Sequence, residues 1–143
     1  MKKVIQLVIL GSIFMLTGCA SSTAEEIEVN KDKIPSVYKV LGEKKIVGTN
    51  SSVKDSVRTT EITYQSGSIS KEEVLQYISY LRENEDFLVT LDTKVVDDMV
   101  MNQLGKESET EGDIVLVDVA YPNNLEGKVV ITYRSGKGEI SVN

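Results

Sequence analysis

The chain has 143 residues and a formal net charge of -6, and it contains no histidine, no tryptophan and a single cysteine. These counts exclude a Ser-His-Asp triad, a His-ligated zinc site, a haem histidine and an intrachain disulfide. The acidic charge argues against nucleic acid and anionic headgroups as partners, because both require clustered Lys or Arg.

The first residues have the organisation of an export signal. Lys2 and Lys3 precede an apolar run from Val4 to Leu16, and polar residues follow at once. The run is shorter than the roughly 20 apolar residues that a membrane-spanning helix needs. The pattern therefore favours a cleaved signal over an uncleaved N-terminal helix.

The end of this segment, Leu16, Thr17, Gly18 and Cys19, resembles the lipobox of bacterial lipoproteins. The resemblance implies a signal peptide over residues 1–18 and a diacylglyceryl thioether on the cysteine, which becomes the first residue. Two acyl chains suffice for stable anchoring, since each buried methylene contributes roughly 0.8 kcal/mol. The expected location is the extracytoplasmic face of a membrane. The mature sequence is similar to small uncharacterised lipoproteins of Gram-positive cell membranes.

The mature chain of 125 residues suits a single domain, and loss of the two signal lysines takes its net charge from -6 to -8. From Ala20 to about Ile34 the sequence is small and charged and has no sustained apolar period. This composition predicts a flexible tether, which Pro35 would end. We therefore expect the lipidated cysteine and tether over residues 19–36 and one domain over residues 37–143.

Two β-leaning runs, Lys44–Thr49 and Val57–Tyr64, come first in the expected domain. Between them lie small and polar residues, which predict a hairpin with a loose loop.

A helix is predicted from about Lys71 to Glu83. Ser70 and Glu73 match a capping box, and Ile69 stands where a hydrophobic staple would begin. Apolar residues then recur at helical spacing at Val74, Leu75, Ile78 and Leu81. Asn84 suits a left-handed stop after the last turn.

The stretch Val95–Leu104 is open to two interpretations. As a helix, it has apolar residues on one face and ends at Gly105. As a strand, it runs from about Met99 to Lys106 and pairs with the next strand through a turn at Glu109–Gly112. The turn and its flanks favour the strand.

The other β-leaning segments are Phe87–Leu91, Ile114–Tyr121, Val129–Tyr133 and Glu139–Val142, with turns at 122–127 and 135–138. Both faces of Ile114–Tyr121 are largely apolar, which is typical of a central strand. The predicted fold is α+β: an antiparallel sheet of about five to seven strands, with the helix packed on one face.

One acidic pattern resembles a calcium loop of the EF-hand type: Glu107, Glu109, Glu111 and Asp118. It departs from that family because Glu replaces the shorter Asp at the first positions, Asp replaces the final bidentate Glu, and no second helix follows. We interpret these residues as a solvated acidic turn. No metal, cofactor or catalytic residue is predicted.

Two further groups of residues are candidate sites. Asp97 and Asp98 could supply an acid and a base, but adjacent residues in a helix or strand point in different directions. Six tyrosines could form a sugar-stacking surface. Their positions on predicted strands and the helix favour packing in the core and at its rim.

The leading functional hypothesis is a non-enzymatic lipoprotein that is tethered to the membrane through Cys19 and binds an envelope protein or wall component. The alternative is a small hydrolase of a cell-wall component, which requires two carboxyl groups that converge in a cleft. A ligand-binding module for a transporter ranks last, since one domain leaves no room for a two-lobed clamp.

Overall fold

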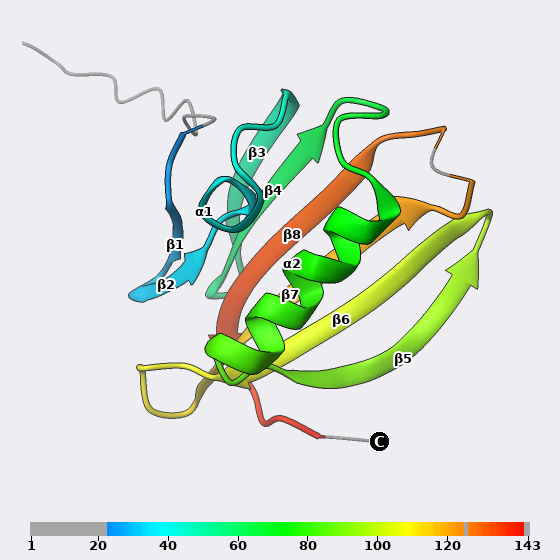
Figure 1. The fold of residues 1–143 in the computed structure, drawn as a ribbon. Coiled ribbons are helices and arrows are strands. Elements are labelled where there is room, and N and C mark those ends of the chain that lie inside the picture. Colours follow the sequence, from blue (N-terminus) through cyan, green and yellow to red (C-terminus); the bar gives the residue numbers. More distant parts are fainter. Residues whose placement is uncertain (1–22, 125, 142–143) are drawn as a thin grey trace, which may run out of the picture.

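The computed structural model describes residues 23–124 and 126–141, so Cys19 and the predicted signal peptide lie outside it. A six-stranded antiparallel sheet carries helix α2 on one face, and a two-stranded sheet and a short helix, α1, lie beside α2 (Figure 1). The α+β class is confirmed, as is the helix on one face. Within the described residues, no helix combines the length and apolarity needed to cross a membrane.

The elements follow the chain in this order: β1 (Glu26–Val29), β2 (Asp32–Pro35), α1 (Val37–Leu41), β3 (Ile46–Lys54), β4 (Val57–Tyr64), α2 (Lys71–Asn84), β5 (Leu88–Val96), β6 (Met99–Glu107), β7 (Asp113–Pro122) and β8 (Val129–Lys137). The large sheet has the order β3-β4-β8-β7-β6-β5. β7 lies between β8 and β6, which confirms its predicted central position. β6 confirms the strand interpretation and excludes the helix at this position.

The core lies between α2 and the sheet. Alternate residues of β7 face α2 and are buried: Val115, Val117, Val119 and Tyr121. On α2, the buried positions are Val74, Tyr77, Ile78 and Leu81. These two apolar rows follow the periods of a strand and a helix.

The start of α2 confirms the predicted capping box. The Ser70 hydroxyl accepts from the Glu73 backbone N–H at 3.2 Å, and the Ser70 N–H donates to the Glu73 carboxylate at 2.9 Å. The other end differs from the prediction, because Asn84 is the last helical residue and Asp86, with φ 57°, has the left-handed conformation. Leu75, expected on the apolar stripe, is 46% exposed.

The predicted tether is wrong from Glu26 onward, because residues 26–35 form the β1–β2 hairpin and belong to the domain. Ile27, Val29 and Ile34 are buried in the core. The alternation of buried and exposed residues is regular here but extends over only four residues in each strand, too few to stand out from a polar background.

Three predicted boundaries are also wrong. β3 continues to Lys54, because β3 and β4 are joined by a two-residue turn in which Asp55 and Ser56 have φ of 50° and 66°. β8 continues through the predicted turn, where Gly136 allows close packing against Val57. Residues 138–141 form no strand.

Candidate functional site: the open face of the sheet

The face of the large sheet opposite α2, which we call the open face, has none of the described helices over it (Figure 1). A hollow of about 660 Å³ lies on this face. Six apolar side chains line it: Leu91, Val96, Met99, Met101, Ala120 and Val130. They come from β5, β6, β7 and β8, the four strands that follow β4 in the order of the sheet.

A row of polar side chains runs through the apolar lining. Gln103 lies directly opposite Asp118 in the register, and its amide donates to one Asp118 carboxylate oxygen at 2.8 Å. Arg134 pairs with the other carboxylate oxygen. The Thr90 hydroxyl donates to the Gln103 side-chain oxygen at 3.0 Å. Hydrogen bonds thus fix four side chains from four strands in one arrangement.

Glu61 is a second carboxylate at this hollow. In the register it lies opposite Thr132, which in turn lies opposite Asp118. One strand separates the two acidic residues, so their backbones are roughly 10 Å apart. Both Asp118 oxygens accept hydrogen bonds, one from Gln103 and one from Arg134, and these hold the Asp118 side chain in the polar row.

The residues of the calcium-like pattern do not come together. Glu107 ends β6, Glu109 and Glu111 lie in the turn that follows, and Asp118 lies in the middle of β7 on the open face. Across the described part of the chain, no group of three acidic, His or Cys side chains is placed to hold a metal.

The paired aspartates, Asp97 and Asp98, form the two-residue turn between β5 and β6, with φ of 49° and 62°. The prediction assumed that these two residues lie in a helix or a strand, and the structure places them in neither. Their backbone conformation is that of a hairpin turn, which Asp tolerates better than most residues.

The tyrosines confirm the prediction of core packing. Four of them are buried: Tyr64, Tyr77, Tyr121 and Tyr133. Burial raises the pKa of Tyr77 and of Tyr133 above the ordinary value for a tyrosine, because the ionised form would lose its hydration. These side chains stabilise the interior and offer no stacking surface.

Sequence reasoning did not identify the residues of the open face, although a signal for them was present. Met99, Met101 and Gln103 alternate with other residues along β6, as Leu116, Asp118 and Ala120 do along β7. The two rows become one surface only through the pairing of β6 with β7. Comparison with models of protein families and with curated proteins finds no match to this chain.

Proposed function

We propose that this chain is an extracytoplasmic lipoprotein that binds another component of the cell envelope through its open face and performs no catalysis itself. The observation that supports this proposal is the uncovered hollow, in which apolar side chains surround a fixed polar row. Contiguous exposed apolar surface on a soluble domain is typical of an interaction site. Met99 and Met101 suit such a site, since methionine adapts its shape to a partner.

The geometry favours binding over the alternative, a carboxylate hydrolase. That reaction needs one carboxyl group that donates a proton and a second that acts as base or nucleophile. The acidic residues at the hollow are Glu61, Asp97 and Asp118. Hydrogen bonds from Gln103 and Arg134 hold Asp118, and Asp97 lies in the β5–β6 turn. The same hydrogen bonds make the polar row a rigid recognition element, because a partner need not order it on binding.

Crosslinking in intact cells tests the proposal. A photoreactive amino acid at Met101, which is 41% exposed on the open face, is compared with one at Leu75, which is 46% exposed on the outer side of α2. We expect discrete adducts from position 101 and none of the same adducts from position 75, with the bound component identified by mass spectrometry. Recovery of the uncrosslinked protein from position 101 under saturating irradiation, or the same adducts from both positions, would contradict the proposal.

A further inference from the structure

The chain is fastened to the domain from Ala24 onward. The Ser36 backbone N–H donates to the Glu25 carbonyl at 2.9 Å, and the Ser36 hydroxyl donates to the Ala24 carbonyl. Ser36 is itself buried and caps α1 through the Lys39 N–H. Further along, the carboxylate of Asp32 accepts from the Ser108 hydroxyl and the Glu109 N–H. The hairpin that follows Ala24 is therefore a fixed part of the domain.

The connection between a lipid on Cys19 and Ala24 is consequently short. Ala24 is five positions after Cys19 in the sequence. A fully extended chain of that length spans at most about 18 Å. The connection is therefore shorter than the tether that the sequence predicted. Its length restricts the orientation of the domain relative to a membrane.

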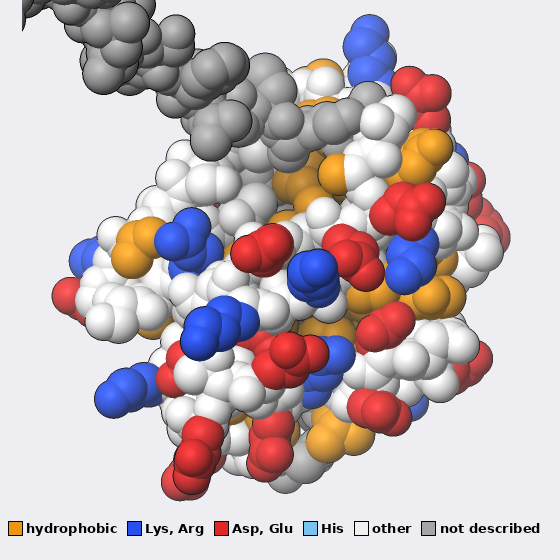
Figure 2. All heavy atoms as spheres, turned by 90° about the vertical axis from the view of Figure 1, so that its left-hand side faces the viewer, with side chains coloured by type: hydrophobic (Ala, Val, Ile, Leu, Met, Phe, Trp, Pro, Cys, Tyr) orange, Lys and Arg blue, Asp and Glu red, His pale blue; other side chains and the backbone are white. Residues whose placement is uncertain are grey.

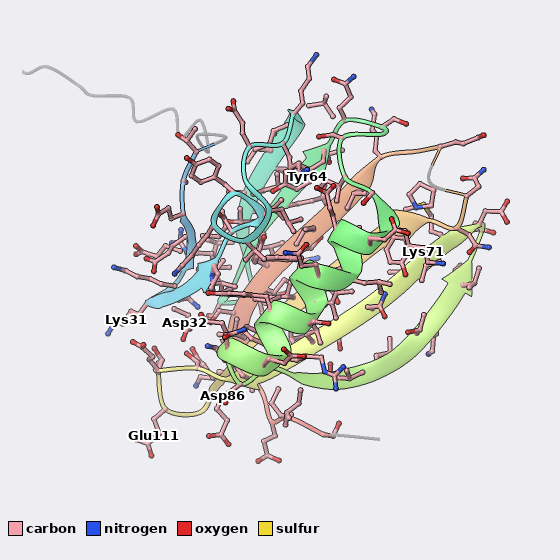
Figure 3. All side chains as sticks on the ribbon, in the orientation of Figure 1. Lys31, Asp32, Tyr64, Lys71, Asp86 and Glu111 are labelled. Atoms are coloured by element: carbon pink, nitrogen blue, oxygen red, sulfur yellow. The ribbon has the colours of Figure 1, made fainter. Side chains whose placement is uncertain are left out.

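Ala24 lies at one end of the sheet, where it shares a small surface pocket with Tyr38, Lys44 and Tyr64. We call this the anchor end. Figure 3 shows Tyr64 and the first residue of α2, Lys71, toward this end, and Asp86 and Glu111 toward the opposite, far end. The fourteen residues of α2 run between the two ends, and at 1.5 Å per residue they separate them by about 21 Å.

We infer that the anchor end of the domain lies against the lipid headgroups, with the far end directed away from the membrane. The inference rests on the lipid on Cys19 that the proposed function includes. It also locates the partner of the open face. Val96 and Met99, two lining residues of the hollow, flank the β5–β6 turn at the anchor end, so this end of the hollow would face the membrane.

The inference rests on chain length rather than on charge. Figure 2 shows acidic and basic side chains interspersed on the side of the molecule that carries β1, β2 and α1, with no extended patch of one sign. Two of the lysines near the anchor end are also paired with acidic residues, Lys39 with Glu26 and Lys44 with Glu73. Headgroups therefore gain little from this surface by electrostatic attraction.

Energy transfer from the protein to labelled lipid tests the orientation. The lipidated protein is reconstituted into vesicles of phosphatidylethanolamine and phosphatidylglycerol that carry a headgroup acceptor. A donor dye is placed on an engineered cysteine at Lys71→Cys or Glu111→Cys, since the single native cysteine is occupied by lipid. Both positions are exposed, and they lie at opposite ends of the domain (Figure 3). We expect severalfold greater transfer from position 71 than from position 111.

A matched variant carries a Gly-Ser insertion of twenty residues between Thr23 and Ala24, which adds about 25 Å of flexible reach. We expect the difference between the two positions to shrink markedly in this variant. Equal transfer from both positions with the native connection, or a difference that the insertion leaves unchanged, overturns the orientation. Failure of the purified protein to float with the vesicles overturns the lipid anchor as well, whereas flotation with equal transfer overturns the orientation alone.

Discussion

The hydroxyl groups of Tyr77 and Tyr133 lie 2.9 Å apart in the core, joining α2 to β8. The Tyr77 hydroxyl also donates to the Pro35 carbonyl at 2.7 Å. Because Tyr77 has one hydroxyl proton and gives it to Pro35, Tyr133 must donate to Tyr77. This chain of hydrogen bonds connects the β1–β2 hairpin, the helix and the large sheet.

Tyr77→Phe should destabilise the domain more than Tyr133→Phe. The first change leaves the Pro35 carbonyl and the Tyr133 hydroxyl without partners, at a cost of about 1–3 kcal/mol. The second leaves the Tyr77–Pro35 hydrogen bond in place and should cost about 1 kcal/mol or less. Urea unfolding of the two variants measures both free energies, and a larger loss for Tyr133→Phe would contradict the assigned direction of donation.

The domain should lose stability above about pH 10. Burial raises the pKa of Tyr64, Tyr77 and Tyr133 above the ordinary value of 10.0, so these groups stay protonated when folded and ionise when unfolded. The contribution of these tyrosines to the free energy of unfolding is complete below the pKa that tyrosine has in the unfolded chain. It declines as pH rises past that pKa, by about 1.4 kcal/mol per pH unit for each tyrosine.

An alkaline titration followed by phenolate absorbance and circular dichroism checks this dependence. We expect part of the phenolate signal to appear only together with loss of secondary structure. Ionisation of all six tyrosines while the domain remains folded would contradict the burial of these three.

Asp32→Ala should loosen the hairpin from the sheet. Asp32 is 3% exposed, and its carboxylate accepts from Ser108, from the Glu109 N–H and from Ser135. Its removal leaves these donors unsatisfied, and we expect a loss of about 2–3 kcal/mol. Glu83→Ala, a change of an exposed acidic residue on α2, is the control and should cost less than 1 kcal/mol. Amide hydrogen exchange should rise in β1 and β2 of the first variant alone.

The cap of α2 should stabilise the domain slightly at neutral pH, and this contribution should be lost in acid. The hydrogen bond from Lys44 is the largest cause that lowers the pKa of Glu73, and the Ser70 N–H adds to it. A lowered pKa stabilises the folded state above the unfolded value of 4.5, and this contribution is lost as pH falls through the folded pKa. Glu73→Gln should cost about 1 kcal/mol or less at neutral pH, because both side chains of the pair keep some contact with solvent. Urea unfolding at a series of pH values measures this contribution. If the free energy of unfolding of Glu73→Gln changes with pH below pH 5 as that of the parent does, the role of Glu73 is refuted.

Local signals predicted the elements that local interactions determine. The Ser70–Glu73 capping box identified the start of α2, and the apolar run of β7 identified a central strand. The β1–β2 hairpin could not be found in this way, because its stability comes from distant residues such as Tyr77 and Ser108. The hollow was hidden for a related reason: the contact between Gln103 and Asp118 depends on strand register, which the sequence left undetermined.

The most direct test of the account is the mass of the N-terminal peptide of the protein purified from its own membranes, since both the proposed function and the orientation require lipid on Cys19. We predict a mature chain that begins at Cys19 and carries the mass of a diacylglyceryl group, and we predict that Cys19→Ala abolishes fatty-acid labelling. An N-terminal peptide that retains residues 1–18, or that contains Cys19 as an unmodified thiol, would contradict the central claim.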